Sequence, residues 1–301
     1  MSPPAADPPK IAKREPVALA LGAGGARGLA QIGVIEELEA RGFEIVAIAG
    51  ASSGALVGGV FAAGRLHEFR EGMEAKTRAD VLRLLDPVLG RPGLINGHRL
   101  VEAMREVVGN PDIESLPVSF TAVAVDLERQ REVWLRTGPL WDALRASFAI
   151  PGLFTPHVVH GRELVDGGLL APLPIAATRM ADAHRLIAVN MNGWPKRPPG
   201  MPAEVPEAPQ ASAQARGGRF TRWLEGRIGG PSGEKSLIDT MGLSLDTMQG
   251  QLARVQLALD PPELVIEIPR DTCHFYEFWR AKEAVEVGRV ETRKALDAAG
   301  Y

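Results

Sequence analysis

The fold is decided by residues 17–56, which read VALALGAGGARGLAQIGVIEELEARGFEIVAIAGASSGAL. The apolar run Val17–Leu21 ends in glycines and is typical of a buried strand. Leu29–Arg41 then places leucine and isoleucine on one helical face and glutamate on the other, and Gly42 ends this helix. Ile45–Ala49 repeats the strand pattern. Strand, helix and strand in so short a segment form a βαβ unit, which predicts a parallel sheet with right-handed crossovers.

The rest of the chain continues this alternation. Strands are expected at Phe120–Val125, Val133–Leu135, Glu163–Val165, Leu186–Asn190 and Leu264–Ile268. Helices are expected at 54–63, 66–76, 98–108, 236–259 and 275–299, and in the stretch that ends at Pro151. We therefore predict an α/β fold, a three-layer sandwich with a central, mostly parallel sheet.

One expected helix carries a regular apolar stripe. Six residues of 236–259 recur at alternating spacings of four and three: Met241, Leu245, Met248, Leu252, Val255 and Leu259. This spacing predicts a helix whose stripe faces the core, with a seam of a homodimer as the alternative.

Composition excludes several classes of protein. The 301 residues are 45% hydrophobic and 24% charged, with a net charge of −3, which is ordinary for a globular protein and does not suggest nucleic acid as a partner. Cys273 is the single cysteine and fits a reducing compartment. The histidines show no metal-ligand spacing, so we predict neither a metal nor a cofactor. No apolar run approaches ~18 residues, so we expect a cytoplasmic protein, alternatively one bound peripherally at the inner membrane surface.

Two segments differ from the expected catalytic domain, residues 16–301. Residues 1–15 are rich in proline and charge, lack the apolar core of a secretory signal, and are expected to be a disordered lead-in. Residues 194–233 are rich in proline and glycine and are expected to be a mobile insertion. Within it, 219–228 has the pattern of a short amphipathic helix, which is typical of a lid or a membrane-surface element. The alternative is a loop whose aromatic side chains pack onto the core.

The sequence Gly50-Ala51-Ser52-Ser53-Gly54 lies where the second strand meets a helix. A serine hydroxyl is a poor nucleophile and must be held exposed beside a base, usually on a sharp turn from strand to helix. Gly50 and Gly54 permit that turn. Ser52, at the centre of the motif, is the candidate nucleophile, and Ser53 is interpreted as a bystander.

A second glycine turn, residues 22–28, joins the first strand to the first helix. Free N–H groups at such a turn attract negative charge, either a dinucleotide pyrophosphate or the oxyanion of an acyl-transfer intermediate. Arg27 occupies the position of the third glycine in the dinucleotide fingerprint, and no acidic residue ends the second strand. Because neighbouring parallel strands end at one edge of a sheet, this turn and Ser52 should lie together, which favours acyl transfer.

A base is expected at Asp166, which with Gly167 and Gly168 follows the short strand RELVD. This would place a carboxylate at the end of a strand. An Asp-Gly turn is also common in loops that have no catalytic role.

Four ordered motifs together resemble the patatin-like phospholipase family, especially its bacterial members, over roughly residues 16–190. They are LALGAGGARGLAQIGVIEEL (19–38), GASSGAL (50–56), RASFAIPGLFTP (145–156) and LVDGGLLAPLPI (164–175). The resemblance implies a serine hydrolase that cleaves lipid acyl esters without a cofactor, through a Ser-Asp dyad that has no catalytic histidine.

Carried over to this chain, the resemblance makes Ser52 the nucleophile and Asp166 the base. The oxyanion loop then comprises Gly24, Gly25, Ala26, Arg27 and Gly28. Two positions depart from the family pattern. Ala23 stands where many members have glycine, and Ala171 stands where an asparagine often follows the Asp-Gly-Gly turn. The second departure removes an amide expected beside the dyad.

Alternatives stay open at this point. A Ser-His-Asp triad would use Ser52, Asp166 and either His184 or His274, in the chain order of an α/β-hydrolase. A lipid-binding or regulatory module without catalysis would retain the same motifs by descent. Trp141 and Phe148 are expected in the core, with lining of an acyl channel as their alternative.

Overall fold

The computed structural model describes residues 11–196, apart from 13, 89, 91, 180, 182 and 184, and residues 237–301. The strands are β1 Pro16–Leu21, β2 Glu44–Ala51, β3 Ser119–Asp126, β4 Arg131–Leu135, β5 His157–Val159, β6 Arg162–Asp166, β7 Arg185–Gly193 and β8 Leu264–Pro269. The α-helices are α1 Ala30–Ala40, α2 Ser53–Ala62, α3 Leu66–Glu74, α4 Arg78–Leu84, α5 His98–Val108, α6 Leu140–Ser147, α7 Ile175–Thr178, α9 Leu237–Leu259 and α10 Ala281–Ala298. Short 3-10 turns are η1 Gly25–Leu29, η2 Ile113–Ser115, η3 Gly167–Leu169 and η4 Phe278–Arg280.

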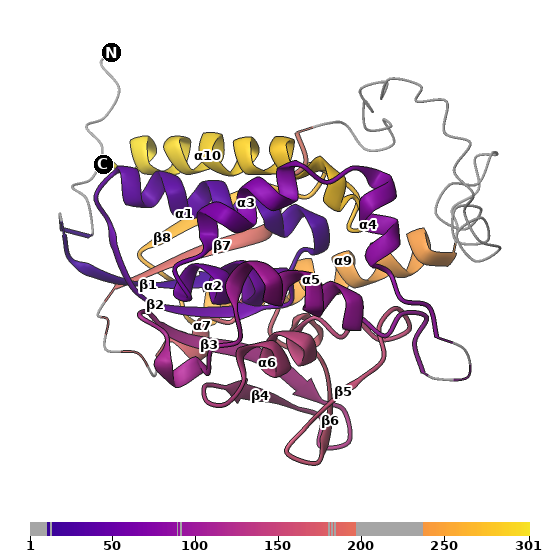
Figure 1. Ribbon diagram of the computed structural model, residues 1–301. Helices are drawn as coiled ribbons and strands as arrows, with labels where there is room; N and C mark the ends of the chain where they lie inside the picture. The colour runs from indigo at the N-terminus through magenta and orange to yellow at the C-terminus, as the bar shows by residue number, and fades with distance from the viewer. Residues whose placement is uncertain are drawn as a thin grey trace, which may run out of the picture.

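The strands form one sheet between two helical layers (Figure 1). Its order is β5-β6-β3-β2-β1-β7-β8, with β4 also paired to β3. The pairs from β3 through β2, β1 and β7 to β8 are parallel, whereas β4, β5 and β6 join by antiparallel pairs. The expected three-layer α/β fold with a mostly parallel sheet is confirmed. The carboxyl ends of β1 and β2 meet at one edge, as the βαβ pattern requires.

The two faces of the sheet carry side chains of different size. In β1, Val17, Leu19 and Leu21 belong to the large core formed with α1, α2 and α10. The alternate residues Ala18 and Ala20 pack in a second cluster with residues of α7 and α9. Because successive side chains of a strand point to opposite faces, the alternation of large and small residues gives one thick helical layer and one closely packed thin layer.

Helix α10 packs closely along α1. A Cβ added to Gly288 would lie 1.9 Å from the carbonyl oxygen of Ala30, and one added to Gly33 would lie 2.0 Å from that of Val285. No side chain fits at either crossing point. Because α1 follows η1 directly, the packing of α10 on α1 also helps to hold the glycine turn, residues 22–28, in place.

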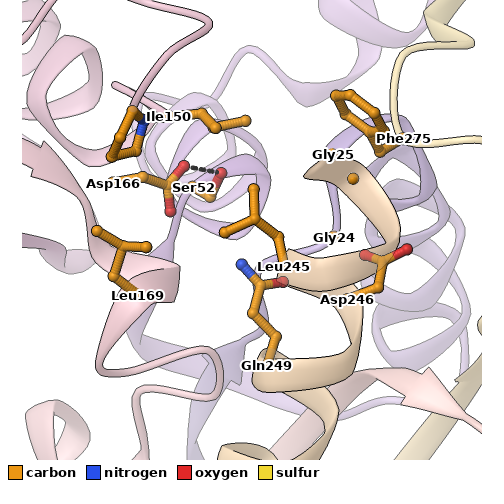
Figure 2. Close-up of a pocket in the computed structure, with 12 residues that line it drawn as sticks. Gly24, Gly25, Ser52, Ile150, Asp166, Leu169, Leu245, Asp246, Gln249 and Phe275 are labelled. Carbon is orange, nitrogen blue, oxygen red and sulfur yellow. Dashed lines mark hydrogen bonds between the residues drawn. The ribbon is translucent and has the colours of Figure 1, made fainter. Parts of the chain in front are cut away.

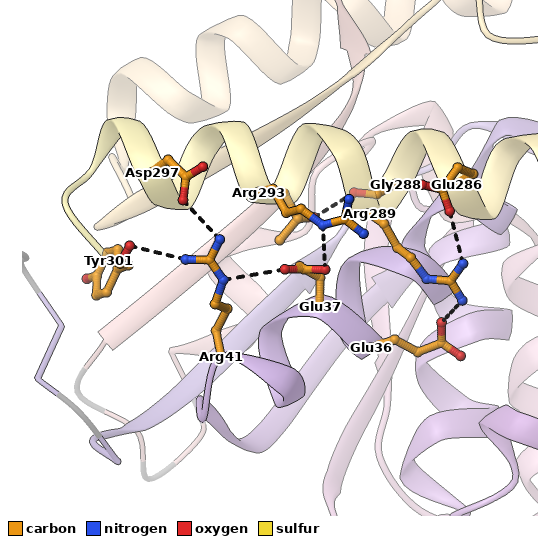
Figure 3. Close-up of polar contacts among 10 residues, drawn as sticks. Glu36, Glu37, Arg41, Glu286, Gly288, Arg289, Arg293, Asp297 and Tyr301 are labelled. Atoms are coloured by element: carbon orange, nitrogen blue, oxygen red, sulfur yellow. Dashed lines mark hydrogen bonds and ion pairs between the residues drawn. The ribbon is translucent and has the colours of Figure 1, made fainter.

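Ion pairs reinforce the same interface (Figure 3). The Glu36 carboxylate of α1 pairs with the Arg289 guanidinium of α10 at an O···N distance of 2.6 Å, and Glu37 pairs with Arg293 at 3.0 Å. The glutamates predicted on the polar face of this helix therefore meet a partner helix. Several pairs acting as a network hold an interface better than isolated surface pairs do.

Two differences from the sequence prediction matter for the site. Helix α4 was not predicted, although Thr77 and Asp80 form a capping box at its start. The terminal helix was expected from residue 275, but α10 begins at Ala281. The Glu277 carboxylate accepts the His274 N–H at 2.8 Å and stabilises a turn there. Phe275 is thereby left in a loop that reaches the candidate site.

The prediction that the α9 stripe faces the core is wrong. Met248, Val255 and Leu259 are 55%, 53% and 80% exposed. An adjacent side of the helix, with the buried residues Gly242 and Ala253, packs inward instead. The sheet presents alanines on this face, so close contact requires small residues on the helix rather than leucine and methionine.

Several predictions fall on residues outside the described part. They are most of the 194–233 insertion, the 219–228 helix and His184. The proposed membrane contact and homodimer remain predictions. Residues 1–10 and 13 also lie outside it, but Ile11, placed in the disordered lead-in, is buried and its N–H donates to the Tyr301 hydroxyl at 2.7 Å. The ordered chain therefore starts before residue 16.

Candidate active site

Ser52 stands on a strained turn between β2 and α2. Its φ is 55° and its ψ is −123°, a conformation that costs a non-glycine residue about 1–3 kcal/mol. A Cβ on Gly50 would lie 2.5 Å from the nitrogen of Ala55, and one on Gly54 would lie 2.2 Å from the carbonyl oxygen of Leu21. Glycine is required at both flanks because the helix passes so close to the strands.

Asp166 ends β6 beside this turn (Figure 2). The Ser52 hydroxyl donates to Asp166 Oδ2 at 2.6 Å, and the Gly168 N–H donates to Oδ1 at 2.7 Å. Asp166 is 3% exposed. Burial raises the pKa of the Asp166 carboxyl to about 6, and the hydrogen bonds from Ser52 and Gly168 oppose that rise. The carboxylate is thus ionised at neutral pH and more basic than an exposed aspartate.

Ser147 is a site residue that sequence reasoning missed. This serine is fully buried at the end of α6, where its hydroxyl accepts the Ser52 N–H at 3.0 Å and donates to the Val123 carbonyl at 2.6 Å. It therefore ties the backbone of the nucleophile to β3. Its position inside the RASFAIPG motif was the available signal, but the motif alone does not say which hydroxyl or backbone group it serves.

The glycine turn lies against the Ser52 turn, as predicted. The Gly24 N–H donates to Ser53 Oγ at 3.1 Å, and a Cβ on Gly28 would lie 2.2 Å from the same oxygen. Ser53 is therefore not a bystander, because its hydroxyl joins the two turns. The Ala26 N–H donates to the Phe275 carbonyl at 2.8 Å. The N–H groups of Gly24 and Ala26 are thus used within the protein.

Two backbone donors at the site are not used in this way. Among the described residues, the structure gives no acceptor for the N–H of Gly25 or of Ser53. Both residues line the larger cavity beside Ser52. The N–H after a nucleophile and one from a neighbouring loop are the usual pair in serine hydrolases built on a strand-to-helix turn. Sequence reasoning included Gly25 and missed Ser53 in this role.

Arg27 is 1% exposed and is therefore not a rim residue. Its guanidinium donates to the Gly24 carbonyl at 3.2 Å, to the Arg270 carbonyl at 2.9 Å and to Asp246 Oδ1 at 2.5 Å. Gly24 belongs to the glycine turn and Asp246 to α9. Arg27 thus fixes helix α9 above the glycine turn.

Of the two histidines of the alternative triad, His184 is outside the described residues and His274 lies away from Ser52. His274 is exposed, stacks on Tyr276 at 5.5 Å between ring centres, and lines neither cavity at Ser52. Cys273 is buried, and burial raises the pKa of its thiol to about 12, so it is a packing residue. Among the described residues, no group of three or more His, Cys, Asp or Glu side chains is placed to hold a metal ion.

Two cavities meet at Ser52, and both are lined by Gly25, Ser52, Ile150 and Phe275. The larger, about 140 Å³, is lined almost entirely by apolar side chains, including Leu56, Met104, Phe148 and Phe154 and residues of α4. Phe148 and Trp141 both lie in the core, as predicted, and Phe148 also lines the larger cavity. The smaller, about 30 Å³, contains Asp166, Asp246 and Gln249.

The two departures from the family pattern are structurally linked. Ala23 and Ala171 are buried and share a cluster of small apolar residues behind the site. No amide side chain projects from position 171, but the carboxamide of Gln249, which belongs to α9, lies beside Gly168.

In the described part of the chain, no helix has both the length and the apolar character needed to cross a membrane.

Comparisons with known proteins identify the family of this chain. An uncharacterized NTE family protein of Mycobacterium tuberculosis is 41% identical over 94% of this chain and 91% of its own length. Lysophospholipase NTE1 of Cryptococcus neoformans is 33% identical over 60% of this chain and 12% of its own. The structure of VipD from Legionella pneumophila aligns with a TM-score of 0.43 and 12% identity, covering 95% of this chain and 67% of that one. The family model for patatin-like phospholipases matches residues 19–179. The chain belongs to the patatin-like phospholipase family.

Proposed function

We propose that this protein is a serine hydrolase that cleaves acyl esters of lipids through Ser52 and Asp166. The observation that carries the proposal is the 2.6 Å hydrogen bond from Ser52 Oγ to the buried Asp166 carboxylate, at the end of a cavity lined by apolar side chains. Such a cavity suits one acyl chain. The name lysophospholipase of the fungal relatives suggests a lipid with a single chain as the substrate class.

The reaction is a double displacement. Asp166 takes the Ser52 proton as Oγ attacks the ester carbonyl, and the N–H groups of Gly25 and Ser53 hold the oxyanion. When the intermediate collapses, the bond to the alcohol oxygen breaks and Asp166 returns the proton to that oxygen. Water then attacks the acyl-Ser52 ester with Asp166 as the base, which releases the fatty acid and restores the serine.

The setting of Asp166 supports its role as a base. An exposed aspartate with a pKa near ~3.9 would take a serine proton poorly. Burial raises the pKa of Asp166 to about 6, closer to neutral pH. Removing one well-placed oxyanion donor typically costs about 3–4 kcal/mol of transition-state stabilisation. The two backbone donors would therefore supply much of the stabilisation that the base does not provide.

Hydrolysis of a chain-length series of esters by purified protein tests this proposal. We expect turnover by the wild type and by His274→Ala, and loss of turnover in Ser52→Ala. We also expect kcat/KM to rise with pH through about 6, as Asp166 loses its proton. Loss of activity in His274→Ala would favour the triad. A folded wild type that hydrolyses no ester would favour the lipid-binding module.

A further inference from the structure

The two cavities at Ser52 differ in which half of an ester substrate each could receive. Asp166 lines the smaller cavity and does not line the larger one. In the proposed reaction, Asp166 must reach the oxygen of the leaving alcohol to return the proton. The alcohol half therefore lies in the smaller cavity, and the acyl chain lies in the larger, apolar one.

Helix α9 supplies two of the four polar side chains that line the smaller cavity, Asp246 and Gln249. Gly242, Leu245, Asp246 and Gln249 all face the smaller cavity. Asp246 Oδ1 pairs with the Arg27 guanidinium, so this oxygen is not available to a ligand. Gln249 differs, because the structure gives its side chain no hydrogen-bond partner among the described residues.

The Gln249 carboxamide lies close to the dyad. A Cβ built on Gly168 would be 2.6 Å from Gln249 Nε2 and 2.9 Å from Asp166 Oδ1, so one small volume separates the amide from the carboxylate. Figure 2 shows the amide pointing from α9 toward Ser52 and Asp166. Glycine at 168 leaves this space open.

We propose that Gln249 hydrogen-bonds the alcohol half of the ester and selects alcohols that carry a hydroxyl group near the ester oxygen. A carboxamide both donates and accepts, so it suits a hydroxyl in either orientation. A site built to bond a substrate hydroxyl discriminates against an analogue that lacks it, because the amide would then be left unpaired. This inference rests on the proposed function and concerns specificity within it. It assigns Gln249 to substrate recognition, not to proton transfer.

The test compares two esters of one fatty acid, 1-monooctanoylglycerol and ethyl octanoate. Gln249→Met keeps the length of the side chain and removes the amide. Gln251→Met is the matched control, because Gln251 is exposed on the same helix and lines neither cavity. We expect Gln249→Met to lower the kcat/KM ratio of glycerol ester to ethyl ester by about 5- to 10-fold, as one lost hydrogen bond requires. Gln251→Met should leave the ratio unchanged.

The outcomes separate this inference from the proposed function. An unchanged ratio in Gln249→Met, or an equal loss with both esters in a folded variant, overturns the role of Gln249 and leaves the hydrolase intact. A wild type inactive on both esters overturns the proposed function and this inference with it. If Gln249→Met does not give the circular dichroism spectrum of the wild type, Gln249→Ala takes its place in the same comparison. The ratio, not the absolute rate, decides.

Discussion

The edge of the sheet and the helix that covers it form two unlike halves of the site. At the edge, Ser52, Asp166 and Ser147 are buried, and hydrogen bonds of 2.6–3.0 Å hold each one. Helix α9 is held above the edge by Arg27, and Gln249 has no protein partner among the described residues. A group that is already bonded to its neighbours is fixed for chemistry, whereas an unbonded one is available to a substrate. In the proposed reaction, the edge therefore carries out the chemistry and α9 selects the alcohol.

The largest expected effect comes from substituting either residue of the proposed dyad at the edge of the sheet. Ser52→Ala and Asp166→Asn should each lower kcat/KM by at least about 10³-fold, because each removes one member of a unit that acts together. Steady-state kinetics with one soluble ester measures this, and circular dichroism verifies folding. Retention of a tenth of the activity in either folded variant would contradict the dyad.

Asp166 should also make stability depend on pH. Its folded pKa of about 6 lies above the ordinary value of 3.8, so the folded state binds the proton more tightly and stability falls as pH rises from about 4 to 6. The cost at pH 7 is roughly 3 kcal/mol. Asp166→Asn removes this cost. In urea unfolding, the free energy of unfolding of the variant should therefore rise relative to that of the wild type as the pH rises from about 4 to 6. A difference between the two that is constant with pH would contradict the raised pKa.

Ser147 tests how far the nucleophile depends on its support. Ser147→Ala leaves the Ser52 N–H without its acceptor and should lower kcat by about 10- to 100-fold with little change in KM, since a small misplacement of a reacting group is costly. Full kcat in a folded Ser147→Ala would show that the strained turn needs no such support. Ser115→Ala is a control for the substitution, because Ser115 is exposed and lines neither cavity at Ser52.

The smallest effect should follow from loosening the cover. Asp246→Asn weakens the bond to Arg27 and should lower the free energy of unfolding by about 2 kcal/mol, less than the loss of a fully buried ion pair. Hydrogen exchange should become faster in α9 and stay unchanged at the carboxyl ends of β1 and β2. Asp260→Asn is the control, because its pair with Arg179 is exposed and contributes little. Equal protection of α9 from hydrogen exchange in both variants would contradict the role of the Arg27–Asp246 pair in holding this helix.

The same division explains what could be predicted from the sequence. The turn at Ser52 and the glycine turn are encoded in short segments with glycines at required contacts, so their meeting followed from two neighbouring parallel strands. Asp166 was paired with Ser52 through the family resemblance, because β6 runs antiparallel to β3 and parallel strand ends do not place it. Phe275 and Gln249 reach the site from distant segments, where a single side chain carries no local signal. Ser147 lies in a quoted motif, but the motif does not show which group its hydroxyl contacts. The α9 stripe misled because its spacing fits a core helix, and only the alanines on the sheet reveal that small residues must face inward.

The most direct test of the central claim is mass spectrometry of the protein after reaction with a fluorophosphonate, which labels an activated serine. The account predicts one adduct, placed on Ser52 and not on Ser53 by fragmentation, absent in Ser52→Ala and formed far more slowly in Asp166→Asn. An adduct at another residue, or ester hydrolysis that proceeds without any adduct, would contradict it.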